Sequence, residues 1–206
     1  MPLFTLFFFT YLIGSFPTAL IIGKVFYGID IRKYGSFNPG ATNSLRVLGK
    51  RAGMIVLLFD VGKGALAAAL PFFFETDIDP LYPGLAAVIG HCFPIFAGFR
   101  GGKAIATTAG VLLIANPSLL LVSYITFFLV IFITKYVFLG SISIGVTMLL
   151  YVLIEPGLKN ELLFFLYLIL LIYLHRSNII NFFHHQEPKF NDKKLKKDRI
   201  NPKKKP

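Results

Sequence analysis

Long apolar stretches separated by short polar loops run through almost the whole sequence, and this alternation constrains the fold more than any other feature. A helix of about 20 apolar residues crosses the roughly 30 Å hydrocarbon core of a bilayer. The chain is 55% hydrophobic, above the roughly 45–50% of ordinary soluble domains. We therefore predict an all-α integral membrane protein with seven transmembrane helices, over residues 1–22, 52–74, 81–99, 104–115, 118–134, 136–154 and 161–174.

Charged residues predict how these helices are oriented. The polar loop at residues 23–51 holds six Lys or Arg side chains and a single acid, Asp30, whereas the loop at residues 75–79 is acidic. Because positively charged loops stay in the cytoplasm, we expect the N-terminus to lie outside. Seven crossings then place the C-terminus in the cytoplasm, in agreement with the nine Lys or Arg side chains found from Lys189 onward.

Residues 1–187 are predicted to form a single polytopic membrane domain, followed by a polybasic cytoplasmic tail at residues 188–206. Nine basic side chains less two Asp give this tail +7 of the net charge of +11. A basic run after a membrane helix attracts anionic lipid headgroups, and with Phe190 as its one aromatic residue it offers no base-stacking surface for nucleic acid. The stretches at 104–115 and 161–174 are short for a crossing, so five full crossings are the alternative to seven.

Two polar stretches that contain glycine have the chemistry of a phosphate site. One is GSFNPGATN, followed by Arg46, with donors on Ser36, Asn38, Gly40, Thr42 and Asn43. The other is the turn RGGK, where backbone N–H groups of Gly101 and Gly102 are expected to surround an anion beside Lys103 and the next helix N-terminus. The structural alternatives are a connector in which Asn43 or Ser44 caps the next helix, and a tight turn with snorkelling cations.

A third polar stretch, HRSNI, closes the last apolar run. On a helix continuing past residue 174, His175 and Asn178 are three positions apart and share a face, which could present an imidazole and an amide to one ligand. Glu187 follows twelve residues after His175. The alternative is anchoring of the helix end at the membrane interface.

Four polar residues within the apolar runs bear on a possible site. Charges inside a membrane are paired or functional, so we expect Asp60 and Lys63 to form a mutual ion pair or, as the second interpretation, the floor of a site. His91 has no second ligand at metal spacing, which favours a hydrogen-bonded packing residue. A membrane serine such as Ser141 more often bonds the backbone of its own helix than does chemistry.

Together the three polar stretches indicate an anionic, phosphorylated ligand on the cytoplasmic face. We find no metal site, no cofactor motif, no catalytic triad and no nucleotide-binding loop in the sequence. The chemistry is therefore expected to rest on orientation and charge stabilisation. A membrane transporter for a phosphorylated metabolite is the alternative, although the sequence has no internal repeat of the kind that transporters carry.

These stretches resemble, in order, the three motifs of the bacterial integral-membrane glycerol-3-phosphate acyltransferases of the acyl-phosphate-dependent PlsY type. GSFNPGATN with Arg46 is similar to the first motif, GHCFPIFAGFRGGKAIAT to the second, and HRSNI with Glu187 to the third. The resemblance implies seven helices in the cell membrane and transfer of a fatty acyl group from acyl phosphate to the 1-hydroxyl of glycerol 3-phosphate, giving lysophosphatidic acid and phosphate. The HxxxxD pattern of other glycerol-phosphate acyltransferases is absent after all four histidines.

The resemblance also implies roles for individual residues. Phosphate groups would be held by Ser36, Arg46 and Lys103, and the acyl phosphate headgroup admitted by Gly101 and Gly102. The reacting centre would be lined by Ser141, His175 and Asn178. Further substrate contacts are expected from Asn38, Gly40, Thr42, Asn43 and Thr107. Either His175 or a substrate phosphate would take the hydroxyl proton, and both possibilities stay open, as does the role of Glu187.

Overall fold

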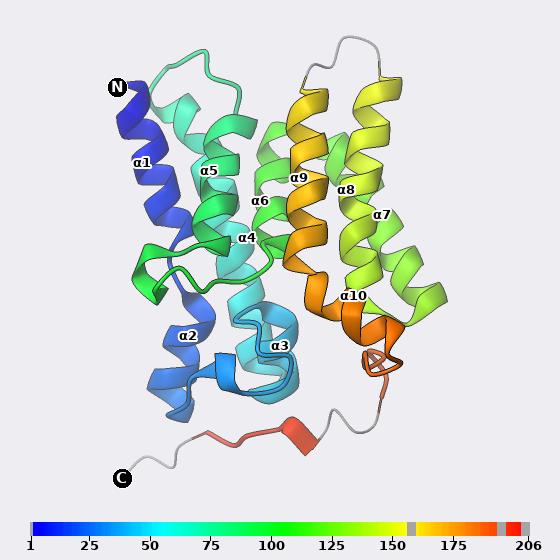
Figure 1. The fold of residues 1–206 in the computed structure, drawn as a ribbon. Coiled ribbons are helices and arrows are strands. Elements are labelled where there is room, and N and C mark those ends of the chain that lie inside the picture. The colour runs from blue at the N-terminus through cyan, green and yellow to red at the C-terminus, as the bar shows by residue number, and fades with distance from the viewer. Residues whose placement is uncertain (1, 156–159, 193–196, 203–206) are drawn as a thin grey trace. The chain divides into compact units, whose positions relative to one another are not determined.

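The computed structural model describes residues 2–155, 160–192 and 197–202, and its regular elements there are helical (Figure 1). Short helical turns at Gly23–Tyr27, Ile31–Lys33 and Ile95–Ala97 join the longer helices. The chain divides into two compact units, residues 1–115 with 193–206 and residues 116–192, which are described separately. The helices are α1 (Leu3–Gly14), α2 (Thr18–Ile22), α3 (Ala41–Val47), α4 (Lys50–Phe73), α5 (Leu81–Cys92), α6 (Ile105–Ala115), α7 (Pro117–Thr134), α8 (Val137–Ile154), α9 (Glu161–Leu174) and α10 (Arg176–Phe183).

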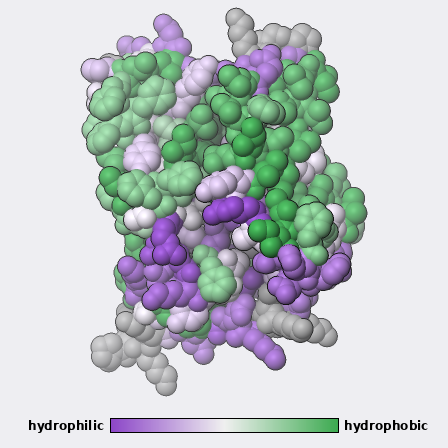
Figure 2. Space-filling view, viewed as in Figure 1, coloured by the Kyte–Doolittle hydropathy of each residue, from purple (hydrophilic) through white to green (hydrophobic). Residues whose placement is uncertain are grey.

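In the described part of the chain, four helical segments are long and apolar enough to cross a membrane. They are Leu3–Tyr27, Lys50–Phe73, Pro117–Thr134 and Val137–Ile154, and α9 with α10 is a fifth candidate, bent by 55°. The helices α5 and α6 are apolar but shorter. Hydrophobic side chains cover most of the helix surface in Figure 2, and hydrophilic ones gather toward the helix ends. The predicted all-helical integral membrane protein is confirmed, and seven crossings stay a prediction.

Small residues let the helices of the first unit approach closely. Helix α1 lies against α5, and α4 lies against α6. A Cβ on Gly64 would collide with the carbonyl oxygen of Thr107, and one on Gly110 would collide with that of Val61. Close backbone approach of this kind provides the van der Waals packing that holds helices together in lipid. The backbones of α4 and α6 are thus in direct contact at two glycines.

The predicted helix at residues 81–99 ends early, at Cys92. Pro94 has no N–H to continue the helix and disfavours helical geometry at Phe93, whose ψ is 62°. After the short turn Ile95–Ala97, Gly98 and Phe99 adopt positive φ angles of 63° and 57°. The glycine turn therefore belongs to an irregular segment that folds back on the end of α5.

A cluster of buried apolar side chains packs against the first polar loop. Ile31, from the turn after Asp30, packs with Val47 and Val56, and all three are fully buried. Ile200, in the described part of the basic tail, is packed against this cluster, and its N–H donates to the Val47 carbonyl at 2.8 Å. Part of the tail is thus attached to the first unit.

The second unit packs α8 between α7 and α9. Gly145 on α8 approaches α9 so closely that a Cβ there would lie 3.0 Å from the Leu171 side chain. The predicted continuous helix past residue 174 is wrong, because α9 ends at Leu174 and α10 begins at Arg176 after the 55° bend. The Nδ1 atom of His175 bonds the Leu171 carbonyl that its backbone N–H also uses, and a side chain inserted into the helical hydrogen bonds bends a helix.

Candidate functional site

Asn43 organises the first polar motif. Its side chain is buried, its Oδ1 accepts the Ser36 N–H at 2.9 Å, and its Nδ2 donates to the carbonyls of Tyr34 (3.0 Å) and Ile31 (3.4 Å). Gly35 has φ 60°, and a Cβ there would collide with the Asn43 amide oxygen. Because the amide is occupied in folding the loop, we assign Asn43 a shaping role.

The alternative in which Asn43 or Ser44 caps the next helix is wrong. Helix α3 begins at Ala41 after Gly40, so both residues lie inside it, and both are buried. Gly40 is also buried. The polar motif side chains that reach the surface fully or in part are those of Ser36, Asn38, Thr42 and Arg46.

The backbone donors of the glycine turn are bonded within the protein. Gly101 N–H donates to the Cys92 carbonyl and Gly102 N–H to the His91 carbonyl, each at 3.1 Å. The last carbonyls of a helix have no partner in the helix itself, and the turn supplies one by folding back on α5. A Cβ on Gly101 would collide with the His91 carbonyl, and one on Gly102 with the His91 ring. Packing thus explains both glycines, and Lys103 stands just after them.

Beneath the turn lies a buried polar cluster. Lys63 Nζ is 2.7 Å from Asp60 Oδ1 and donates to the Phe16 carbonyl at 3.1 Å, so the predicted ion pair is confirmed. His91 Nδ1 lies 3.1 Å from Thr107 Oγ1 and 3.6 Å from Asp60 Oδ1. His91 is thus a hydrogen-bonded packing residue, as expected, and the buried Thr107 hydroxyl supports it.

A small cavity of about 10 Å³ connects this cluster to the turn. Asp60, Lys63 and His91 line it on one side, and Gly101 and Gly102 line it on the other. Such a volume holds about one water molecule. The polar cluster and the glycine turn thus line the same small cavity.

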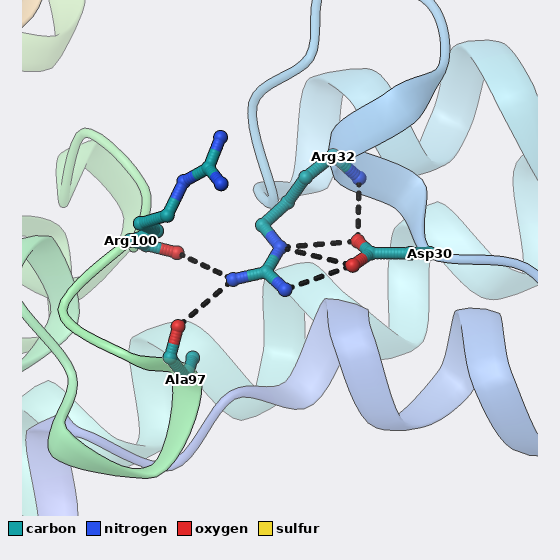
Figure 3. Close-up of polar contacts among 4 residues, drawn as sticks. All are labelled: Asp30, Arg32, Ala97 and Arg100. Carbon is teal, nitrogen blue, oxygen red and sulfur yellow. Dashed lines mark hydrogen bonds and ion pairs between the residues drawn. The ribbon is translucent and has the colours of Figure 1, made fainter.

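Arg32 ties the first polar loop to the glycine turn (Figure 3). Its Nε and Nη2 contact the Asp30 carboxylate at 2.8–3.3 Å, and its Nη1 donates to the carbonyls of Ala97 (2.8 Å) and Arg100 (3.5 Å). The side-chain hydrogen bonds between Arg32 and Asp30 lower the pKa of the Asp30 carboxyl and raise the pKa of the Arg32 guanidinium. The sequence identified Arg32 only as one of six loop cations.

His175, in the second unit, is held in a defined orientation. The ring is 3% exposed, and Nδ1 lies 2.9 Å from the Leu171 carbonyl oxygen. A carbonyl oxygen can only accept, so this contact requires the proton on Nδ1 and leaves Nε2 as the acceptor of the neutral ring. That tautomer is the one a base acting through Nε2 needs.

The other residues predicted in the second unit have partners of their own. Asn178 Nδ2 donates to Glu187 Oε1 at 2.7 Å, which orients the Asn178 amide. Ser141 is buried, and its hydroxyl donates to the Val137 carbonyl at 3.1 Å, as expected for a serine in a membrane helix. Glu187 is thus placed beside a candidate site residue, a pairing that the sequence left open.

The predicted site residues are divided between the two units. The first unit holds Ser36, Asn38, Gly40, Thr42, Asn43, Arg46, Gly101, Gly102, Lys103 and Thr107, and the second holds Ser141, His175 and Asn178. Within the first unit, the Arg32 contacts bring the first motif's loop and the glycine turn together. Within the second, the bend at His175 separates α9 from the helix that carries Asn178.

Comparison of the sequence with known families gives one consistent result. Residues 4–185 match the family model described as glycerol-3-phosphate acyltransferase. Glycerol-3-phosphate acyltransferase 2 of Bacillus cereus is 47% identical over 198 residues, which are 94% of this chain and 98% of that protein. The glycerol-3-phosphate acyltransferase of Bacillus subtilis is 47% identical over 87% of this chain and 93% of its own length.

Two solved structures share the fold. They are crystal structures of PlsY (YgiH), an integral membrane glycerol 3-phosphate acyltransferase. The glycerol 3-phosphate form has a TM-score of 0.83 and 36% sequence identity, over 91% of this chain and 95% of that one. The lysophosphatidic acid form has a TM-score of 0.80 and 35% identity, over 90% and 94% of the two chains.

Proposed function

The chain belongs to the glycerol-3-phosphate acyltransferase family and is an integral membrane enzyme that makes lysophosphatidic acid, and we propose that its acyl donor is acyl phosphate. The observation that carries the proposal is the likeness, over 91% of the chain, to a PlsY structure, because the three motifs resemble the acyl-phosphate-dependent PlsY type. The absence of HxxxxD after His91, His175, His184 and His185 argues against the acyl-CoA or acyl-carrier-protein class. Acyl phosphate is an activated donor, so orientation and charge stabilisation supply the catalysis without a cofactor.

The phosphate groups of the two substrates are proposed to meet side chains of the first unit. Ser36 and Arg46 reach the surface of the first motif, and Lys103 follows the glycine turn. Since the Gly101 and Gly102 N–H groups are bonded to carbonyls, charged and hydroxyl side chains supply the attraction. Further contacts with glycerol 3-phosphate are proposed for Asn38 and Thr42, and for backbone at Gly40. A hydrogen bond to a charged group contributes about 1.5–3 kcal/mol.

The reacting groups are proposed to be His175, Ser141 and Asn178. The Nδ1 contact with Leu171 favours Nε2 of His175 as the atom that accepts a hydrogen bond from the attacking hydroxyl. Glu187 orients the Asn178 amide through their 2.7 Å hydrogen bond. Either His175 or a phosphate oxygen of the substrate takes the proton as the acyl–oxygen bond forms and inorganic phosphate leaves.

The enzyme is proposed to cross the cell membrane seven times, with its N-terminus outside and its C-terminus in the cytoplasm. The charge of the loop at residues 23–51 and the basic tail support this orientation. With Cys92→Ala as background, single cysteines at Asp77 and Lys33 can be tested with an impermeant maleimide on intact cells. We expect Asp77→Cys to react in intact cells and Lys33→Cys only after the membrane is opened. The opposite pattern would invert the topology.

Acyl donor and site are tested together on purified protein. We expect phosphate release and lysophosphatidic acid formation from palmitoyl phosphate and glycerol 3-phosphate, with His175→Ala folded but inactive and Lys103→Ala folded but weakened about ten- to hundredfold. His184→Ala is the matched control, because His184 also places Nδ1 near an i−4 carbonyl, at 2.8 Å, but on the surface. Turnover with palmitoyl-CoA but not with palmitoyl phosphate would refute the proposal that acyl phosphate is the acyl donor. Full activity of His175→Ala would refute the role of His175.

A further inference from the structure

We propose that Arg32 is a positioning residue that holds the glycine turn, and with it Lys103, in register with the first polar motif. Its contacts join two segments more than sixty positions apart in the sequence, Asp30 to Arg32 and Ala97 to Arg100 (Figure 3). The inference rests on the proposed role of Lys103 in holding phosphate. It adds a residue to which the sequence motifs assign no role.

The Arg32 guanidinium donates hydrogen bonds from two of its edges, one to the Asp30 carboxylate and the other to two backbone carbonyls. Nε and Nη2 form a forked contact with the Asp30 carboxylate, with distances of 3.0 Å and 2.8 Å to its two oxygens. Nη1 points the other way, to the Ala97 carbonyl at 2.8 Å and the Arg100 carbonyl at 3.5 Å. Arginine alone among side chains carries donors in such a rigid planar fork, so a lysine cannot reproduce both contacts.

Asp30 holds the arginine in place. Its Oδ1 also accepts the Arg32 backbone N–H at 3.0 Å, which caps the short helical turn Ile31–Lys33. The Asp30 and Arg32 side chains are 20% and 19% exposed, so water and salt screen their attraction less than they would on an open surface. The pair therefore presents Nη1 to the turn in one orientation.

Two sets of hydrogen bonds hold the glycine turn. In the first set, the N–H groups of Gly101 and Gly102 donate to carbonyls at the end of α5. Gly98 and Phe99, between the Arg32 contacts at Ala97 and Arg100, have positive φ angles, which are strained for a residue with a Cβ such as Phe99. Arg32 bonds the backbone on both sides of this strained pair and thereby fixes where the turn leads.

The same contact sets the distance between the two motifs. Two residues after Arg32, the Tyr34 carbonyl accepts the Asn43 amide that folds the first motif. Three residues after the Arg100 carbonyl stands Lys103. A loss of the Arg32 contact would let the turn move while each motif keeps its own internal hydrogen bonds. The expected consequence is weaker binding of substrate phosphate, not unfolding.

The rival explanation is that Arg32 touches substrate phosphate itself, and Asp30→Asn separates the two. This variant keeps an amide oxygen to accept the Arg32 backbone N–H but removes the charge that orients the guanidinium. A positioning role predicts weaker binding, because the fork is lost. A direct contact predicts tighter binding, because a carboxylate no longer competes with the substrate for Arg32.

The test compares KM and kcat for palmitoyl phosphate in Arg32→Gln, Arg32→Lys, Asp30→Asn and the double variant Asp30→Asn with Arg32→Gln. We expect KM to rise about ten- to hundredfold in all four, the range for a lost hydrogen bond to a charged group. The double variant should lose no more than Arg32→Gln, because both changes remove one contact. Lys33→Gln is the control: it removes the same charge from the same turn, on an exposed side chain, and should leave KM unchanged.

The readout distinguishes positioning from general loss of structure, since a partly unfolded preparation has a lower kcat at unchanged KM. An unchanged KM in Arg32→Gln, or a lower KM in Asp30→Asn, would overturn the proposal. If Arg32→Gln does not fold, the direction of the KM change in Asp30→Asn decides between the two explanations: a higher KM supports positioning, and a lower KM supports direct contact with substrate phosphate. Lys103→Ala, measured beside them, separates the two proposals: an unchanged KM there refutes the phosphate contact of Lys103 whatever the Arg32 variants do.

Discussion

Replacing Lys63 by methionine tests whether the buried ion pair supports the first unit. Lys63 Nζ lies 2.7 Å from Asp60 Oδ1 and 3.1 Å from the Phe16 carbonyl, on helix α4. Methionine has a similar length and no charge, so packing is largely kept. The change leaves the Asp60 carboxylate buried without its cation and the Phe16 carbonyl without its donor.

The expected loss in free energy of unfolding is large because both side chains are shielded from water. They are 8% and 3% exposed, so the discount that applies to surface ion pairs does not apply here. Removing one partner of a buried pair costs about 3–5 kcal/mol, because an uncompensated charge is left behind. Removing the charge as well, in Asp60→Asn with Lys63→Met, should leave about 1–3 kcal/mol, the cost of unsatisfied polar groups.

The single cysteine offers the assay. Cys92 is 3% exposed at the end of α5, next to His91 of the same buried cluster. A maleimide dye that fluoresces on reaction with a thiol therefore reports unfolding of this unit. In a chain of this size each kcal/mol of lost stability lowers the melting temperature by about 2–4 °C. Lys63→Met should therefore melt roughly 6–20 °C below the parent and the double variant roughly 2–12 °C below it, so the double variant recovers about half of the loss.

Lys50→Met is the matched control, because Lys50 is an exposed cation at the start of the same helix. It should melt with the parent. The reasoning is refuted if Lys63→Met melts within about 2 °C of the parent, or if the double variant melts below the single one. The second result would mean that the Asp60 carboxylate itself, and not its pairing, stabilises the unit.

Three other outcomes are expected. Gly110→Ala should lower the melting temperature because a Cβ there collides with α4. Gly62→Ala is the control: a Cβ there has nothing within 4 Å, so the change should be neutral or stabilising by up to about 1 kcal/mol. Equal melting temperatures of the two variants would contradict the close packing of α4 on α6. Arg32 lowers the pKa of Asp30 below its usual 3.8, so the pair's contribution to stability is complete above pH 3.8 and is lost as the pH falls through the lowered pKa. The melting temperature should therefore fall less steeply with acid in Asp30→Asn than in the parent. Glu187→Gln, which keeps an acceptor oxygen, should retain more kcat than Glu187→Ala, and equal loss would show that the charge matters instead.

Hydropathy predicted the class of fold but not where its helices end. Apolarity indicates that a segment prefers lipid, and a non-helical segment can be just as apolar. Residues 93–99 illustrate this, since Ile95, Phe96 and Phe99 are all large, apolar and exposed, yet the helix ends at Cys92. Pro94 was the available signal, because it cannot continue a helix. The bend at His175 had no comparable signal, as neither proline nor glycine occurs there.

The sequence predicted site residues in three motifs, which stay predictions, and gave no role to Arg32. The sequence shows Arg32 only as one of six cations in the loop at residues 23–51. Its proposed role comes from contacts with backbone carbonyls far along the chain. Backbone carbonyls are present at every residue, so no sequence pattern marks the ones that will accept. The acid two positions earlier was the only local indication, because Asp30 and Arg32 can pair at that spacing.

The glycine turn shows how a glycine pattern that suggests a ligand can have a different physical cause. A missing Cβ makes room for whatever approaches the backbone, and the sequence does not say whether that is a ligand or the protein itself. At Gly101 and Gly102 it is the protein, because His91 fills the space and the two N–H groups bond the end of α5. Alanine at Gly102 should therefore disturb the turn through His91, and on our proposal the attraction for phosphate comes from side chains such as Lys103. An anion site built from side chains depends on where the turn is held, and that gives the Arg32 contact its importance.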